Sequence, residues 1–352
     1  MPKTVFFLGN GFSQGLGFPS LSELWHLSFQ LSDPWYQQVF QLEECKQQYP
    51  VSRFLKAGSE IPDLELLLTV WSAYCEAHEL HVPNSNAHES SRGLLEGYIA
   101  NLCYRLLLHT HQGMKTSAFN DFAAFLKRLT SEQSVGFITT NYDLAIEALA
   151  SKLSKPYVFL DENHSHDAIP VRKLHGSVAW FLSPSPQPIS VPSELGLPAR
   201  FFEYHEDETG TRSTIYDYSL QCLKNPNTCK LLHLKCVSQI HVSDVAPLTT
   251  IIPPVIGKEY GPLFKEVSQY SLMDTAAVDS LVIIGYSLPE ADPFIRQLVV
   301  DMCKTRGKIF FINSNQEACK QAEKWLHGTA KIISREWEKV IPLLEKVVAS
   351  SN

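Results

Sequence analysis

The sequence lacks the features of exported and membrane-spanning proteins. No apolar run approaches the roughly 18 residues that a membrane-spanning helix needs, and even the segment from Leu66 to Cys75 is interrupted by Thr69 and Ser72. Residues 1–8 contain neither the apolar stretch nor the small-residue cleavage site of a signal peptide. We therefore expect a cytoplasmic protein with no membrane partner.

A strong excess of one charge is also missing. The chain has 30 Lys and Arg against 37 Asp and Glu, a formal net charge of -7, and no block of five or more like charges. Proteins that read nucleic acids present a basic face to the phosphates. The composition therefore predicts no direct nucleic-acid readout.

Metal-binding patterns are equally scarce. The eight cysteines include no CxxC pair, the tight spacing that structural zinc sites use. Asp161, His164, His166 and Asp167 could bind a metal by residue type, but in a polar segment a solvated charge cluster is the simpler interpretation. We expect reduced thiols and no metal.

The chain is long enough to bury a full core without disulfides, since 44% of its 352 residues are hydrophobic. Short apolar strands alternate with helical segments, which predicts an α/β fold with a doubly wound, mostly parallel, Rossmann-like sheet. The expected strands are 4–8, 135–139, 157–160, 172–174, 281–285, 308–313 and 331–333. One helix is expected between the strand 135–139 and about residue 153, and three more are expected to begin at about residues 292, 316 and 336.

Two long segments interrupt this alternation. Between residues 20 and 132 the apolar residues recur at spacings of three and four, which predicts a helical insertion that begins with a capping box at Ser20. A further helix start is expected at Asp33-Pro34. Residues 183–230 are rich in proline and serine near their start, so we expect a loop excursion, with strands resuming at about Thr249.

Polar or glycine-rich residues follow four of the expected strands, in segments 9–13, 139–143, 173–177 and 285–289. The carboxyl ends of parallel strands meet at one sheet edge, where such folds bind ligands. The four segments are therefore expected to line one crevice. Glycines after the first strand would let backbone amides approach an anion.

Each segment alone also has a simpler interpretation. The first can be an ordinary glycine turn, because it departs from the dinucleotide-binding pattern and its helix is not expected to begin at once. Thr140, Asn141 or Asp143 can cap the following helix. His175 can be structural, although a histidine at a strand end suits a general base. Gly285-Tyr286-Ser287 suggests a nucleophile elbow, but Pro289 replaces its closing glycine.

Taken together, the segments resemble the sirtuin-like NAD-consuming family, and in particular its bacterial antiviral-defence branch. The resemblance extends over about 310 residues and depends on short motifs in the same order. They are Gly9 to Ser13 followed by Gly17-Phe18-Pro19, Thr139 to Asp143, Leu174 to Ser177, Gly285 to Leu288, and the strand that ends at Asn313. It implies that residues 1–352 form a single NAD-binding catalytic domain.

The resemblance also implies roles for individual residues. His175 would be the base, Asn141 would hold the nicotinamide ribose and a water, and Asp143 would lie near the carboxamide. The remaining residues would bind the nucleotide. Gly9, Gly11 and Ser13 would hold the phosphates, Ser287 and Asn313 would face the adenosine, and Phe12, Thr140 and Gly285 complete the predicted NAD-binding set.

Two departures from sirtuin deacylases bear on the reaction. The four-cysteine zinc module that follows their His-Gly motif is absent, and Ser20-Leu21-Ser22 stands where they have Asp-Phe-Arg. NAD glycohydrolysis to nicotinamide and ADP-ribose is therefore the first hypothesis. An NAD-dependent protein deacylase and a non-catalytic NAD or ADP-ribose sensor are the alternatives. By family analogy we expect a homo-oligomer and a defence partner such as an ATPase or nuclease.

Overall fold

The structure is a computed structural model. It describes residues 2–18, 116–159, 168–183, 262–290, 292–305 and 307–349, together with five short strands between residues 205 and 251. Most of the predicted helical insertion 20–132, including the helix starts at Ser20 and Asp33, lies outside the described residues, as do the polar residues 161–167 and the proline-rich residues 184–198.

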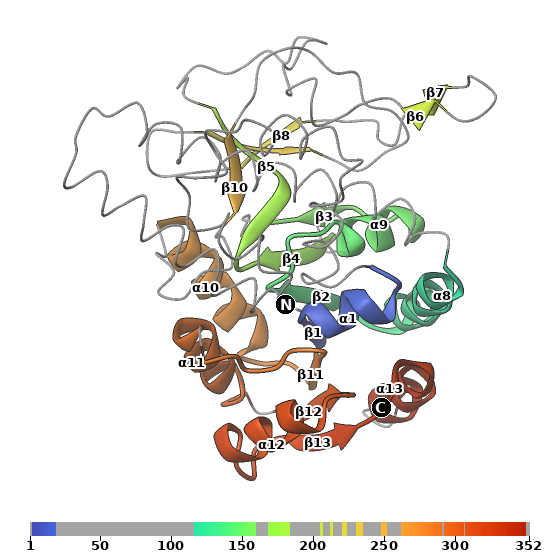
Figure 1. The fold of residues 1–352 in the computed structure, drawn as a ribbon, viewed down its shortest axis with the longest axis vertical. Coiled ribbons are helices and arrows are strands. Elements are labelled where there is room, and N and C mark those ends of the chain that lie inside the picture. The colour runs from blue at the N-terminus through green and yellow to red at the C-terminus, as the bar shows by residue number, and fades with distance from the viewer. Residues whose placement is uncertain are drawn as a thin grey trace, which may run out of the picture.

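Seven strands form the main sheet in the order β13-β12-β11-β1-β2-β4-β3 (Figure 1). All of the described pairings between these strands are parallel. Their bounds are β1 Thr4–Leu8, β2 Val135–Thr139, β3 Tyr157–Val158, β4 Ile169–Lys173, β11 Ser280–Ile284, β12 Lys308–Asn313 and β13 Lys331–Ser334. The predicted fold class, a doubly wound, mostly parallel α/β sheet, is confirmed.

Helices cover both faces of this sheet (Figure 1). One face carries α8 (Ser117–Glu132), α9 (Ala145–Lys152) and α13 (Val340–Ala349), the last preceded by a single 3-10 turn at Trp337–Lys339. The other face carries α10 (Pro262–Thr275) and α11 (Pro293–Met302), which contact each other. In the sequence, α12 (Gln316–Trp325) connects β12 to β13. No helix among the described residues is long and apolar enough to span a membrane.

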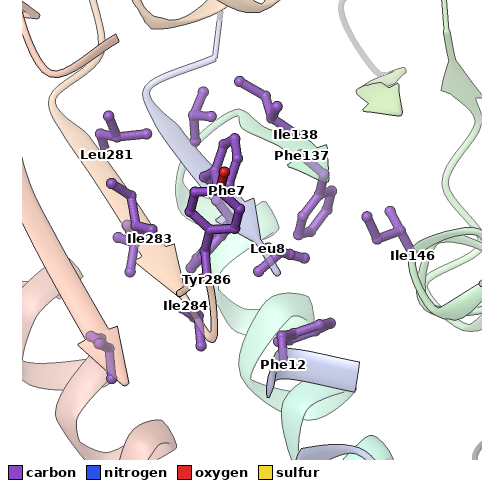
Figure 2. Close-up of a cluster of buried hydrophobic side chains, with 14 of the residues drawn as sticks. Phe7, Leu8, Phe12, Phe137, Ile138, Ile146, Leu281, Ile283, Ile284 and Tyr286 are labelled. Carbon is purple, nitrogen blue, oxygen red and sulfur yellow. The ribbon is translucent and has the colours of Figure 1, made fainter. Parts of the chain in front are cut away.

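The central strands supply the core. Alternate residues of a strand point to opposite faces, and in β1 both faces are apolar because helices cover both. Phe6 packs against Phe122 of α8 at 6.2 Å between ring centroids, whereas Phe7 packs against Tyr286 at 5.0 Å. Figure 2 shows these two rings together, with Leu281 and Ile283 of β11 on one side of them and Phe137 of β2 on the other.

Two expectations about the short elements are wrong. The first is that strands resume only at about Thr249, whereas two strands, β8 (Leu220–Leu223) and β9 (Lys230–Leu234), precede that residue. They form a four-stranded antiparallel sheet with β5 (Gly176–Ser183) and β10 (Leu248–Ile251). Two further short strands, β6 (His205–Glu206) and β7 (Arg212–Ser213), pair with each other. Cross-strand neighbours largely decide whether segments such as β8 and β9 form strands, and the sequence does not show those neighbours.

The second correction concerns the first turn of the chain. A helix, α1 (Asn10–Gly15), begins directly after β1, whereas we expected a delay. Its glycines disfavour a helix, so tertiary packing must hold it. Phe12 of α1 is buried against the rings of Phe122 and Trp337, at 5.0 and 5.7 Å between centroids.

Candidate active site

The predicted segments meet at one edge of the main sheet. In the parallel register Leu8 pairs with Thr139 on one side and with Ile284 on the other, and Thr139 pairs with Lys173. The four polar segments therefore leave the sheet at the same level. This arrangement places them along the carboxyl edge, where open α/β sheets bind ligands.

Ser13, Asn141 and Asp143 form a buried hydrogen-bonded cluster at this edge. The Ser13 hydroxyl donates to Oδ2 of Asp143 over 2.6 Å and accepts from Nδ2 of Asn141 over 2.8 Å. The same Nδ2 donates to the carbonyl of Gly9 over 2.9 Å. Both amide hydrogens of Asn141 are thus used, and its Oδ1 is the atom that can accept from a ligand.

Asp143 has a second, structural task. Its Oδ1 accepts the backbone amide of Ala145, the first residue of α9, over 2.9 Å. The N-cap residue of α9 is Leu144, which makes no side-chain capping bond, so Asp143 supports the start of α9 from the position before the cap while it also belongs to the cluster. Burial raises the pKa of the Asp143 carboxyl, and the charge of Lys173 opposes that rise.

A buried ion pair underlies the cluster. Nζ of Lys173 lies 2.7 Å from Oε1 of Glu147, and both side chains are fully buried. Lys173 also donates to the backbone carbonyl of Asp143 and, over 3.0 Å, to Oγ of Ser177. One lysine at the end of β4 therefore ties together the segment after β2, helix α9 and the start of β5.

His175 lies at the same edge, two residues after Lys173. Its ring stacks on Tyr142, the residue between Asn141 and Asp143, at 6.0 Å between centroids and 30° between planes. Its Nε2 lies 2.7 Å from Oδ2 of Asp292, and both side chains are buried. The structure thus brings His175 to the Asn141 segment, as the sequence predicts.

Asp292 is a site residue that was not predicted from the sequence, where it marks only the start of a helix. Its one signal was its place in the chain, five residues after Ser287 in the segment that leaves β11. Nothing in the spacing paired it with His175, which lies 117 positions earlier. That pairing follows from the order of the strands in the sheet.

The glycines of the first and fourth segments fit against each other. A Cβ on Gly9 would lie 2.5 Å from Cα of Tyr286, and one on Gly285 would lie 2.2 Å from the amide nitrogen of Phe12. Gly285 also has a φ of +66°, which disfavours any side chain. The amides of Gly9 and Gly11 donate to the carbonyls of Ile284 and Gly285, so these glycines close the backbone of the turn.

The other predicted nucleotide-binding residues differ in their placement. The Phe12 ring is buried in the core, where it packs against Phe122 of α8. Asn313 is buried, with Nδ2 donating to the carbonyl of Tyr286 over 3.0 Å and Oδ1 accepting from the amide of Asn315. Thr140 is partly exposed and Ser287 is exposed at the edge.

Groups of three or more His, Cys, Asp or Glu side chains that could hold a metal do not occur among the described residues. The polar side chains that the structure brings together at this edge include the amide of Asn141, the hydroxyl of Ser13, the carboxyls of Asp143 and Asp292 and the imidazole of His175.

The comparisons with known proteins gave matches only among solved structures. Neither a family model nor a curated protein matches the chain. It is similar to a Sir2 homologue in complex with NAD, with 16% identity, a TM-score of 0.37, and coverage of 100% of this chain and 91% of that one. It is also similar to a mutant Sir2 homologue with 2'-O-acetyl ADP-ribose, with 16% identity, a TM-score of 0.36, and coverage of 100% of this chain and 94% of that one. For a mutant Sir2 homologue with ADP-ribose, the identity is 15%, the TM-score is 0.34, and the match covers 99% of this chain and 94% of that one.

Proposed function

We propose that the protein is an NAD glycohydrolase, which cleaves the bond between nicotinamide and ribose. The observation that carries the proposal is the buried arrangement of His175 with Asp292 beside the Ser13, Asn141 and Asp143 cluster. A base and a fixed acceptor at the ligand-binding edge of a parallel sheet are what cleavage of this bond by water requires.

The reaction needs little acid assistance. As the bond between C1' and the ring nitrogen breaks, its electron pair neutralises the pyridinium, and nicotinamide leaves uncharged. The ribose passes through an oxocarbenium-like state, as in other glycoside cleavages. Water then forms the new bond to C1' and gives one proton to the base, so NAD+ and water yield nicotinamide, ADP-ribose and a proton.

Asn141 is suited to hold the ribose or the water. Gly9 and Ser13 fix its amide hydrogens, so Oδ1 is presented in one orientation to a hydroxyl or a water. Asp143 fixes Ser13 in turn, and its remaining lone pairs can accept from the carboxamide of nicotinamide. His175 takes the proton, a contribution of about 10² to 10⁴ in rate.

The experiment is incubation of the purified protein with NAD and chromatographic analysis of the products. We expect nicotinamide and ADP-ribose from the wild type and losses of about 10²- to 10⁴-fold for His175→Ala and of similar size for Asn141→Ala. His327→Ala, at an exposed histidine outside the site, is the matched control and should keep full activity. Equal turnover by all four proteins would overturn the assignment.

Two further measurements separate the alternatives. A protein deacylase would consume NAD only when an acylated peptide is added, and a sensor would bind NAD or ADP-ribose tightly without turnover. Turnover of NAD alone, at a rate that acyl peptide does not change, supports the glycohydrolase. Calorimetric binding without products would favour the sensor.

We further propose, from the sequence resemblance, that this activity depletes NAD as the effector of a bacterial antiphage defence system. Hydrolysis of a central cofactor would require restraint, which a homo-oligomer or a partner such as an ATPase or nuclease could supply. Light scattering combined with activity measurements tests this. Full activity from an isolated monomer would contradict gating by assembly.

A further inference from the structure

Asp292 occupies an unusual position for a helix-capping residue. It stands at the N-cap of α11, directly before Pro293, where an aspartate side chain normally accepts the free amides of the first helical turn. Here the side chain makes no capping hydrogen bond, although the Asp292 carbonyl does accept the amide of Arg296 over 3.0 Å. The carboxylate therefore forgoes a favourable local role.

The carboxylate is directed instead at His175. Only 1% of its side chain is exposed, and Oδ2 lies 2.7 Å from Nε2 of the imidazole. A buried carboxylate is strongly unfavourable unless a charged or hydrogen-bonding partner compensates its lost hydration. Oδ2 is within ion-pair distance but lies off the hydrogen-bond direction of Nε2, and catalytic hydrogen bonds often align only when the ligand binds.

The two residues come from distant parts of the sheet. His175 follows β4, whereas Asp292 ends the segment after β11, and β1 and β2 lie between these strands in the sheet. The contact therefore spans the carboxyl edge from one side of the predicted crevice to the other. A carboxylate that only stabilised α11 would not need to reach across it.

We propose that Asp292 is the positioning residue of His175, and this inference depends on the proposed glycohydrolase activity. Asp292 holds the imidazole so that one ring nitrogen faces the attacking water while Nε2 faces the carboxylate. When the water forms its bond to C1' and gives its proton to His175, the ring becomes an imidazolium, and the adjacent carboxylate stabilises that charge. Asp292 itself gains no proton and touches no substrate atom.

Asp292→Asn is the variant that tests this role. Asparagine has nearly the same shape and is an equally good N-cap residue, so α11 should still form. Asp301→Asn, on the last turn of the same helix and outside the site, is the matched control. We expect Asp292→Asn to lower kcat by about 10²-fold or more, within the range of base catalysis, with little change in KM. The control should be unaffected.

The double variant distinguishes positioning from simple support of the fold. If Asp292 acts through His175, Asp292→Asn together with His175→Ala should be no slower than His175→Ala alone, because the two residues act as a unit. Losses that multiply would indicate a separate structural role and overturn the proposal. Side-chain ¹⁵N NMR of histidine gives a second readout, in which Asp292→Asn should change the signals of His175 and leave those of His327 unchanged.

The outcomes also separate this inference from the proposed function. If the wild type turns over no NAD, both fall together. If the wild type and Asp292→Asn hydrolyse NAD equally, while His175→Ala does not, the glycohydrolase stands and only the role of Asp292 is overturned. Folding of each variant is checked by its urea unfolding curve.

Discussion

On the β2 and β4 side of the candidate site, buried side chains form ion pairs and hydrogen bonds with one another. On the β11 side, most of the contacts are hydrogen bonds and close packing of the backbone. Lys173 with Glu147 and Ser13 with Asp143 are buried polar pairs on the first side. On the second, the amides of Gly9 and Gly11 donate to β11 and the turn after it, and Ser287 is exposed.

This difference shows how each side can fail. A buried polar network depends on every member, because removing one partner leaves the other without compensation for its lost hydration. A closely packed backbone tolerates changes of side chain but not an added Cβ. The side-chain half is therefore suited to place reacting groups, and the backbone half, apart from the buried carboxylate of Asp292, to give the crevice its shape.

The largest effect is expected where a buried charge loses its partner. Lys173→Met should lower the free energy of unfolding by about 3 to 5 kcal/mol, because the buried carboxylate of Glu147 would lose the cation that lies 2.7 Å from it. Urea unfolding measures the loss. Lys324→Met, at an exposed position of α12, should change stability by less than about 0.5 kcal/mol.

A second variant shows whether the charge itself is responsible. Adding Glu147→Leu to Lys173→Met removes the buried carboxylate that has lost its cation and should recover part of the lost stability. If the double variant is less stable than Lys173→Met alone, the loss of the cation beside the Glu147 carboxylate was not the cause.

The next largest loss of stability is expected from a substitution in the closely packed backbone on the β11 side. Gly285→Ala combines a positive φ, at about 1 to 2 kcal/mol, with overpacking against Phe12, at about 1 to 3 kcal/mol. Gly328→Ala is the matched control, because Gly328 has a φ of +72° and no atom within 4 Å of the added Cβ. Thermal or urea unfolding should show the larger loss for Gly285→Ala, and equal losses would mean that the close approach contributes nothing.

These contrasts also show what the sequence could predict. The strands that form the main sheet were predictable because each is a short apolar run between turn residues. The strands β1, β2 and β12 have the predicted bounds, whereas β4 begins three residues before the expected strand 172–174. The edge that carries Asn141, Asp143 and His175 follows from parallel strands alone. The strand expected at about Thr249 is β10, but helix α10 and the other strands of the antiparallel sheet were not predicted.

The contacts between side chains within the site could not be predicted from the sequence for a different reason. The motif indicates that Ser13 and Asn141 both belong to the site, but not that the hydroxyl of one holds the amide of the other. Their separation of 128 residues gives no spacing to interpret. The same holds for Asp292, which only the folded chain brings to His175.

A smaller effect, on pH dependence, tests the burial of Asp143. Burial raises the pKa of this carboxyl in the folded state above its ordinary value of 3.8. Its contribution to stability is therefore fully present below that value and is lost as the pH rises through the folded pKa. Asp143→Asn cannot ionise, so the stability of the wild type relative to this variant should fall as the pH rises above about 4.

Asp301 supplies a control of opposite sign. The hydrogen bond from Lys304 lowers the pKa of its carboxyl, so its contribution is present above the unfolded value and is lost as the pH falls through the folded pKa. Relative to Asp301→Asn, the wild type should therefore gain stability as the pH rises, by a small amount at this solvated site. Urea unfolding between pH 3 and 7 measures both differences, and the same sign for both would contradict the burial of Asp143.

The smallest effect is expected at Arg296, a buried arginine of α11 that differs from Arg172 of β4. Arg172 pairs with Asp274 over 2.8 Å and also donates to the carbonyl of Phe159. For Arg296, Nε and Nη2 have no hydrogen-bond partner in the part of the chain that the structure describes, and the guanidinium lies 4.7 Å from the ring centre of Trp325.

Arg296→Met should therefore leave the free energy of unfolding within about 1 kcal/mol of the wild type. The variant loses the contact with Trp325, worth about 0.5 to 2 kcal/mol, but it also removes buried donors whose lost hydration costs about 1 to 3 kcal/mol. Arg172→Met leaves Asp274 unpaired and should lose several times more stability. A large loss for Arg296→Met in urea unfolding would mean that its guanidinium has an acceptor in the folded protein.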